Sequence, residues 1–280
     1  VSDVPLGAFL SGGIDSSTIV ALMQAQSDQA VKTYSIGFEE AGYNEAEQAK
    51  AVAQHLKTDH HELYIKPQDA LDVVAQLPHI YDEPFADASA IPTYLVSKFA
   101  RESVSVALSG DGGDEMLGGY TRHISGPKAW NATNNIPPKF RKPIAQMIRG
   151  VPPSLWSSLR PNRPQFGSHM HKFADTLEKH TQGDVYLSLV SNWPKPRMCV
   201  TDGYEEMIPL VDPDMQIDGV TFAEEMMYWD TLSYLNGDIL TKVDRASMAV
   251  SLEARAPLLD RRIYDYVWRL PLDMKIRNKK

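Results

Sequence analysis

The sequence predicts an α/β fold in which a parallel sheet is flanked by helices and followed by a second, α-helical lobe. In the first half of the chain, short β-rich runs alternate with segments of helical periodicity, which is the pattern of a parallel sheet with helices on both faces. Two of the runs stop at Ser-Gly followed by acidic and glycine residues, at 11–17 and 109–115. The second half is rich in proline and in helical segments.

Residues 1–125 are predicted to form the sheet domain. Residues 6–10, LGAFL, predict a strand that stops at Ser-Gly-Gly, and the apolar spacing from Asp15 onward predicts a helix to residue 26. By the same criteria we expect further strands at 31–38, 61–65 and 104–108, and further helices at 44–56, 67–77 and 88–101. Each strand is thus followed by a helix, as the connections of a parallel sheet require.

Residues 126–280 are predicted to form a mostly helical lobe that completes the domain. Prolines are dense over 126–165, where no β-rich run occurs. Helical spacing returns at 171–180, 183–191 and 222–250. The chain starts at Val1, close to its first strand, and 277–280 shows no clear terminator, so we expect both ends to be cuts through a longer polypeptide.

The composition argues against several classes of function. The net charge of the 280-residue chain is −8 and no block of Lys and Arg occurs, which argues against binding to nucleic acid. Cys199 is the single cysteine, so a disulfide framework and a multi-cysteine metal site are excluded. The chain has neither a run of about 18 apolar residues nor a basic-then-apolar leader, so we expect a cytoplasmic protein without a membrane segment.

The first candidate site is the segment SGGIDSS at 11–17, expected at the end of a strand and the start of a helix, where parallel sheets bind ligands. Gly12 and Gly13 let the backbone approach a phosphate, and the helix N-terminus adds free N–H groups. Hydroxyl donors come from Ser11, Ser16 and Ser17. The alternative is a plain glycine-rich turn, but the full string after a strand favours binding of ATP phosphates. The chain has no GxxxxGK[ST], so kinase and GTPase functions are not favoured.

Acidic residues occur in both loops. An aspartate is unexpected in a binding site for an anion unless it binds a cation. We therefore expect Asp15 to bind a Mg²⁺ ion that bridges the phosphates. The segment SGDGGDE places Asp111, Asp114 and Glu115 within five residues, and such carboxylates repel unless a cation or amine lies among them. We expect Asp114 to complete the Mg²⁺ site, and Asp111 to orient or deprotonate an amine nucleophile. An acidic surface turn is the alternative.

A third group of charged residues lies in 240–260, which we predict on one helix. Lys242 and Arg245 are expected to reach the phosphate chain and to stabilise pyrophosphate as the leaving group. An ion-paired helix docked on the sheet is the alternative, and for Glu253 and Arg255 the two interpretations stay equally open.

Two other polar segments are weaker candidates. The acidic loop 81–89 fits a substrate pocket and a helix cap equally well. His60, His61 and Glu62 begin a predicted strand in which neighbouring side chains point to opposite faces, so structural roles are favoured over a metal site.

The three motifs together, SGGIDSS, SGDGGDE and LTKVDRASMAVSLEARAPLLD, resemble the synthetase domain of glutamine-hydrolysing asparagine synthetases, which have the ATP-pyrophosphatase fold. The resemblance extends over about residues 1–275. It implies that ATP and Mg²⁺ activate the carboxylate of aspartate or a related acid as an acyl-AMP with release of pyrophosphate, and that ammonia then forms the amide. It also implies contacts to ATP from Leu10, Ile36, Ser109 and Gly110.

Two departures from the family pattern affect the substrates. Asparagine synthetases resemble SGEGSDE at the second motif, whereas Asp111 is one methylene shorter, which places its carboxylate about 1.5 Å further back. An acceptor other than aspartate, as in amidotransferases of surface-polysaccharide or secondary-metabolite pathways, therefore stays open. The family also has an N-terminal glutaminase domain with a nucleophilic cysteine; this chain has none, so we expect that domain in the full-length protein.

Two further classes of protein are alternatives. A non-catalytic nucleotide-binding module would have no need of the intact Ser11, Asp15, Asp111 and Asp114. A tRNA-modifying pyrophosphatase would need a basic face and often catalytic cysteines. The sequence favours neither, and it leaves a homodimer open.

Overall fold

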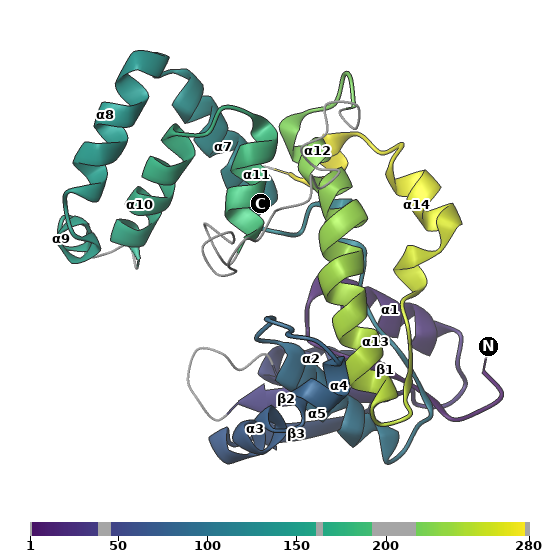
Figure 1. The fold of residues 1–280 in the computed structure, drawn as a ribbon. Helices are drawn as coiled ribbons and strands as arrows, with labels where there is room; N and C mark the ends of the chain where they lie inside the picture. The colour runs from purple at the N-terminus through teal and green to yellow at the C-terminus, as the bar shows by residue number, and fades with distance from the viewer. Residues whose placement is uncertain (1, 39–45, 161–164, 192–216, 278–280) are drawn as a thin grey trace. The chain divides into compact units, whose positions relative to one another are not determined.

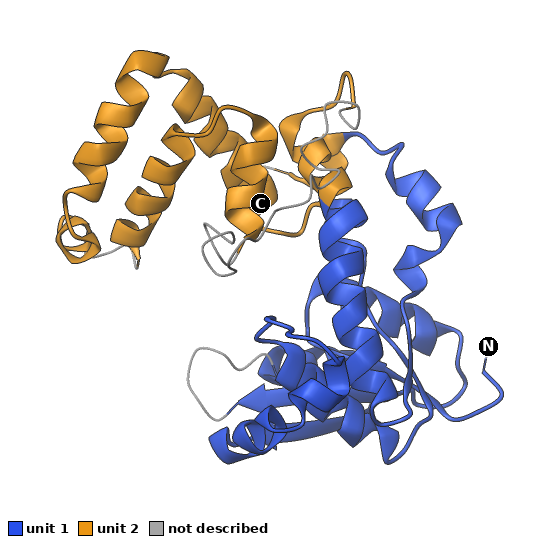
Figure 2. Cartoon of the chain, viewed as in Figure 1, with its two compact units in different colours: residues 1–117, 230–271 blue, residues 118–229, 272–280 orange. Residues whose placement is uncertain are grey.

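The computed structural model describes residues 2–38, 46–160, 165–191 and 217–277, which fall into two compact units (Figure 1). Unit 1 comprises Val1–Leu117 and Asp230–Pro271, and unit 2 comprises Gly118–Trp229 and Leu272–Lys280 (Figure 2). The stretch Asp230–Pro271 thus belongs with the sheet, whereas the sequence predicts a single boundary near residue 125. Cys199 lies outside the described residues.

Unit 1 contains a five-stranded sheet in which all neighbouring strands are parallel. The strands are β1 (Leu6–Phe9), β2 (Lys32–Phe38), β3 (Asp59–Ile65), β4 (Val106–Leu108) and β5 (Glu253–Arg255), in the order β3-β2-β1-β4-β5. The chain proceeds from β1 through β2 to β3 on one side and then returns to place β4 on the other side of β1. The reversal of strand order therefore lies between β1 and β4, and ligands of open parallel sheets bind at such a point.

Helices cover both faces of the sheet, as the sequence predicts. They include α1 (Ile14–Ala25), α2 (Ala46–Leu56) and α5 (Ala90–Arg101). Further helices of unit 1 are α3 (Pro67–Val74), α4 (Leu77–Tyr81) and α6 (Gly113–Leu117). One buried cluster joins Ala8 of β1 to Val20 of α1 and Ala49 of α2. Another joins Tyr34 of β2 to Ala100 of α5. Because successive residues of a strand point to opposite faces, the two clusters form separate cores that hold the sheet between helical layers.

The predicted helix over 222–250 is divided into three parts. It consists of α12 (Phe222–Trp229) in unit 2, then the π-helix η4 (Asp230–Leu240) and α13 (Thr241–Met248) in unit 1. The prediction that 240–260 forms one helix is wrong. The helix ends where Ser251 adopts a left-handed conformation and Leu252 N–H donates to the Ser247 carbonyl at 3.0 Å. Leu252 is then fully buried against the sheet, and β5 pairs with β4.

The C-terminal part of unit 1 is helical again, with η5 (Pro257–Leu259) and α14 (Arg261–Val267). No helix in the described part of the chain is long and apolar enough to cross a membrane.

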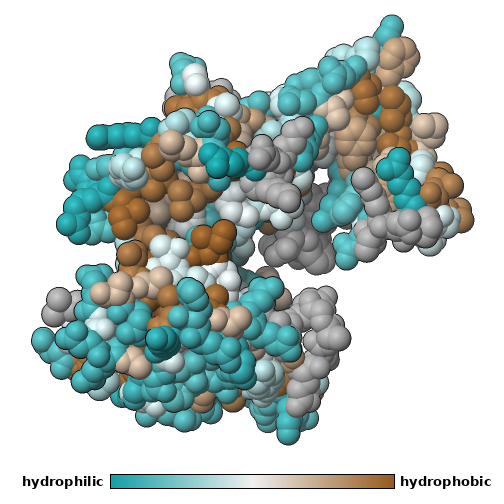
Figure 3. Space-filling view, turned by 180° about the vertical axis from the view of Figure 1, so that it is seen from behind, coloured by the Kyte–Doolittle hydropathy of each residue, from teal (hydrophilic) through white to brown (hydrophobic). Residues whose placement is uncertain are grey.

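The described part of unit 2 contains helices and no strand. Besides α12 they are α7 (Arg122–Asn134), α8 (Pro138–Arg149), α9 (Pro153–Ser158), α10 (Phe166–Leu177), α11 (Gln182–Val190) and α15 (Leu272–Lys275). Pro138 and Pro153 occupy the first turns of α8 and α9, where a missing N–H costs nothing, which explains how a proline-rich segment forms helices. In Figure 3 hydrophobic residues are visible on the surface of these helices, whose exposed side chains include Phe140, Met147, Leu155 and Leu159.

Candidate active site

The two glycine-rich loops that follow β1 and β4 pack directly against each other. A Cβ atom on Gly110 would lie 2.7 Å from the Ser16 nitrogen, and a Cβ atom on Gly113 would overlap the Asp15 carboxylate. Both approaches are closer than a side chain tolerates. Glycine at these two positions therefore brings the second loop onto the first turn of α1, at the reversal of strand order.

The first loop is stabilised by its own serine hydroxyls. Ser11 Oγ and Ser16 Oγ lie 2.9 Å apart, Ser11 N–H donates to Ser16 Oγ at 3.2 Å, and Gly13 N–H donates to Ser11 Oγ at 3.3 Å. Gly13 precedes α1 without a side-chain cap, and the N–H groups of an uncapped first turn are suited to bind an anion. Ser17 Oγ is buried and has no hydrogen-bond partner among the described residues. Such a loop can bind phosphate oxygens.

Asp15 and Asp114 bring two negative charges to this loop. Burial, and then the charge of Asp114, raise the pKa of Asp15 to about 6. In the described part of the chain no group of three or more His, Cys, Asp and Glu side chains is placed to hold a metal ion alone. Mg²⁺ usually takes one or two protein carboxylates together with phosphate oxygens and water. A pair of repelling carboxylates beside a loop that can bind phosphate oxygens fits that donor set.

Asp111 lies in the same cluster. Burial raises its pKa, although a hydrogen bond from Ser109 and the positive charge of Lys242 act in the opposite direction, and Asp114 adds to the rise. Ser109 is buried, and its N–H donates to the Arg255 carbonyl at 2.8 Å, which fixes the end of β4 against β5. The strand pairing therefore sets the position of Asp111.

Lys242 is buried on α13 and contacts the acidic loop 81–89. Its Nζ atom lies 2.6 Å from Asp87 Oδ2 and 2.7 Å from Ser89 Oγ. Although burial alone would raise it, the pKa of Asp87 is lowered by hydrogen bonds from Lys242 and from Ser89. The loop leads into α5, whose N-terminus has no side-chain cap, so the structure does not support the helix-cap interpretation. The substrate-pocket interpretation stays a prediction, and the loop touches a candidate catalytic lysine.

Arg245 is placed differently from Lys242. Its Nη1 atom lies 2.7 Å from Asp82 Oδ2, and both side chains are well exposed, at 41% and 75%. The structure therefore brings Asp15, Asp111, Asp114 and Lys242 into one cluster, with Arg245 one turn of α13 away in an ion pair.

The remaining predicted ATP contacts lie on or next to two neighbouring strands. Leu10 directly follows β1; its side chain is buried, and its N–H donates to the Tyr34 carbonyl at 2.9 Å. Ile36 is half-buried in β2 and pairs with Leu63 of β3. Because the side chain of Leu10 faces the core, only its backbone can meet a nucleotide.

Four other polar residues of the sequence analysis lie outside this cluster. Glu253 and Arg255 form an exposed ion pair of 2.7 Å on β5, so the ion-pair interpretation holds for them, on a strand rather than a helix. His60 contacts Thr33 Oγ1 through Nδ1 at 2.9 Å, while His61 stacks on Tyr34 of the other core cluster. The predicted alternation of the two histidines is confirmed.

Alanine at Gly12 is expected to destabilise the protein more than alanine at Gly219. Both glycines have φ of +80°, which costs an alanine about 1–2 kcal/mol, but the new Cβ would lie 2.7 Å from Ala49 N at Gly12 and would meet nothing within 4 Å at Gly219. Overpacking should add about 1–3 kcal/mol for Gly12→Ala. The measurement is the midpoint of urea unfolding, and equal midpoints for the two variants would contradict the close packing of the first loop on α2.

Comparison with known proteins shows the family of the chain. The asparagine synthase family model matches residues 1–280. The chain is 31% identical to asparagine synthetase [glutamine-hydrolyzing] 1 of Bacillus subtilis, covering 99% of the chain and 42% of that protein. It is 52% identical to a putative asparagine synthetase of Methanocaldococcus jannaschii, covering 88% and 46%, and 33% identical to one of Mycobacterium tuberculosis, covering 98% and 40%. The chain spans less than half the length of each relative. It belongs to the asparagine synthase family.

Proposed function

We propose that the chain is the synthetase part of an ATP-dependent, amide-forming ligase. In this reaction a substrate carboxylate attacks the α-phosphorus of ATP, pyrophosphate leaves, and ammonia then replaces AMP on the acyl carbon. The observation that supports the proposal best is the direct packing of the two glycine-rich loops at the reversal of strand order. That packing places an uncapped helix N-terminus beside the carboxylates of Asp15 and Asp114.

The first loop would bind the phosphates. Its glycines allow close approach, and its serines and the first turn of α1 donate hydrogen bonds. Bound Mg²⁺ would neutralise charge on the phosphates, held by Asp15 and Asp114. Leu10, Ile36 and the Ser109-Gly110 pair would contact the rest of the nucleotide through the neighbouring strand ends.

Lys242 and Asp111 would act at successive steps. The ammonium group of Lys242 is suited to stabilise the negative charge that develops on pyrophosphate as it leaves, and we propose the same for Arg245 once its exposed ion pair with Asp82 opens. Asp111 is suited to hold ammonia and to accept a proton as the amide forms.

The names of the relatives support glutamine as the nitrogen source and aspartate as the acceptor. A glutaminase domain in the full-length protein would supply the ammonia. The side chain of Asp111, shorter than the glutamate of the family motif, supports a second candidate acceptor, a carboxylic acid other than aspartate. The chemistry of activation would be the same for that acceptor.

The products of the full-length protein test this proposal. We expect AMP and pyrophosphate when ATP, Mg²⁺ and ammonia are supplied with aspartate or, failing turnover, with each of a panel of related acids. The reason is that the first loop would surround phosphates with backbone and hydroxyl donors and the chain has no Walker lysine. ADP and phosphate as the main products would contradict the assignment, and amide detected by mass spectrometry would identify the acceptor.

A further inference from the structure

Two residues of the acidic loop 81–89 hold the ammonium group of Lys242. Nζ of Lys242 donates to Asp87 Oδ2 at 2.6 Å and to Ser89 Oγ at 2.7 Å, across more than 150 positions of sequence. The Lys242 side chain is only 9% exposed and that of Asp87 only 16%. A buried charge pair of this kind is weakly screened by solvent, so its geometry is well defined compared with a surface ion pair.

The three side chains form a closed ring of hydrogen bonds. Asp87 Oδ1 accepts from Ser89 N–H at 2.7 Å and from Ser89 Oγ at 2.8 Å, which leaves Oδ2 for Lys242. The Ser89 hydroxyl in turn accepts from Lys242. An ammonium group has three donors, and the ring uses two of them, so the direction of the third is fixed.

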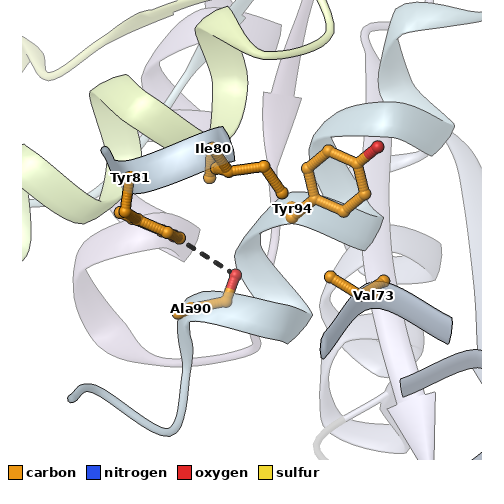
Figure 4. Packing of buried hydrophobic residues seen from close by; sticks show 6 residues of the cluster. Val73, Ile80, Tyr81, Ala90 and Tyr94 are labelled. Carbon is orange, nitrogen blue, oxygen red and sulfur yellow. Dashed lines mark hydrogen bonds between the residues drawn. The ribbon is translucent and has the colours of Figure 1, made fainter. Parts of the chain in front are cut away.

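Apolar packing fixes the two backbones that contribute to the ring. Ala246, one turn beyond Lys242 on α13, is fully buried in a cluster with Tyr81 of α4 and Ala90 of α5. Figure 4 shows the packing of this cluster and the hydrogen bond from Tyr81 Oη to the Ala90 carbonyl, which measures 3.4 Å. Asp87 and Ser89 lie in the short connection between these two helices. The backbone that carries Lys242 and the backbone that carries Asp87 and Ser89 are therefore both held by the packing of this cluster.

We propose that Asp87 and Ser89 are positioning residues that aim the Lys242 ammonium at the pyrophosphate leaving group, without contacting the substrates themselves. The inference rests on the proposed function. Burial raises the pKa of Asp111, and the positive charge of Lys242, which attracts the Asp111 carboxylate, opposes that rise. The ammonium group thus lies in the electrostatic field of the Asp87 and Asp111 carboxylates. The ring keeps the ammonium group from pairing with Asp111, and this leaves the Asp111 carboxylate available for ammonia.

The test compares variants of the full-length protein in pyrophosphate release with ATP, Mg²⁺, ammonia and the acceptor acid. We expect Asp87→Asn to lower kcat by about 10- to 100-fold, because an amide oxygen can serve Ser89 or Lys242 but not both, and small displacements of a catalytic group have effects of that size. The KM for ATP should stay nearly constant, since the lost interaction is one of the transition state. Ser89→Ala should have a smaller effect in the same direction.

The matched control is Asp175→Asn on α10. It removes one carboxylate from an ion pair of 2.7 Å with Arg149, and it should leave kcat unchanged. A double substitution separates positioning from other roles: in a Lys242→Met background, Asp87→Asn should cause no further loss of kcat. An equal loss in both backgrounds, or a parent-like kcat for Asp87→Asn, would overturn the inference.

Folding of each variant is checked by thermal unfolding. If Asp87→Asn does not fold, Ser89→Ala decides the question, because it keeps the ion pair and removes only one hydrogen bond. A parent-like kcat for that variant would then overturn the inference. A parent protein that forms no pyrophosphate with any acceptor acid would contradict the proposed function itself, and this inference with it.

Discussion

Asparagine in place of Asp15 is expected to slow pyrophosphate release by about 10²–10³-fold. On the proposed function, a neutral amide would not supply the negative charge that holds Mg²⁺. A metal that stabilises transition-state charge contributes several kcal/mol, with about 1.4 kcal/mol for each factor of ten. Asp15 lies on the first turn of α1, where the second loop packs against it. The measurement is the initial rate of pyrophosphate release by the full-length protein over a range of Mg²⁺ concentrations.

The same substitution should stabilise the protein without ligands at neutral pH. Burial and the charge of Asp114 raise the pKa of Asp15 from 3.8 to about 6, so the folded state keeps a proton that the unfolded state loses. This contribution to stability is complete below pH 3.8 and is lost as the pH rises through about 6. Asp15→Asn should therefore unfold at a higher urea concentration than the parent above pH 6, with a difference that shrinks as the pH approaches 3.8.

A slower rate together with a higher stability would show that the Asp15 carboxylate serves the reaction and destabilises the fold. Loss of both would indicate a structural role instead. A rate like that of the parent at every Mg²⁺ concentration would show that Asp15 does not serve the metal.

Asp111→Asn is expected to slow amide formation by about 10²–10⁴-fold, the usual contribution of a positioned general base, while the affinity for ATP changes little. Asp111 follows Ser109 and Gly110, at the point where the second loop meets α1. A carboxylate there would repel ATP phosphates, so it is poorly suited to ground-state binding of the nucleotide. It is well suited to hold ammonia by hydrogen bonds and to take a proton from it.

Two assays separate the half-reactions that Asp111 could affect. Exchange of labelled pyrophosphate into ATP follows adenylation, and amide formation from ammonia follows the second step. Asp111→Asn should retain most of the exchange and lose the amide. The matched variant is Asp111→Glu, which restores the glutamate found at this position of the asparagine synthetase motif. A change in the preferred acceptor acid would show that the shorter side chain of Asp111 selects the acceptor. If Asp111→Asn formed the amide at the rate of the parent, Asp111 would only cap the loop and would have no role in amide formation.

The sheet could be predicted from the sequence wherever the signal is local. LGAFL and VKTYSIGF are apolar or alternating runs, and each ends where a glycine-rich loop or a helical pattern begins. The parallel arrangement followed from the alternation of strands and helices. The two motif loops were predicted to share a Mg²⁺ site through Asp15 and Asp114, and in the structure the loops pack together through Gly110 and Gly113.

The rest depends on contacts between distant segments. β5 is only three residues long and two of them, Glu253 and Arg255, are charged, so its place is determined by pairing with β4 and not by its own pattern. The position of Asp230–Pro271 in unit 1 follows from the same pairing and from the packing of α13 on α5. Likewise, nothing near Lys242 in the sequence indicates Asp87 as its partner.

Transfer of ¹⁸O tests the formation of an acyl-adenylate most directly. The full-length protein would be supplied with ATP, Mg²⁺, ammonia and an acceptor acid whose carboxylate is labelled with ¹⁸O, and the products would be weighed by mass spectrometry. If the carboxylate attacks the α-phosphorus, one labelled oxygen must appear in AMP once ammonia has displaced AMP from the acyl carbon. Label in inorganic phosphate, or amide formation with unlabelled AMP, would contradict the account.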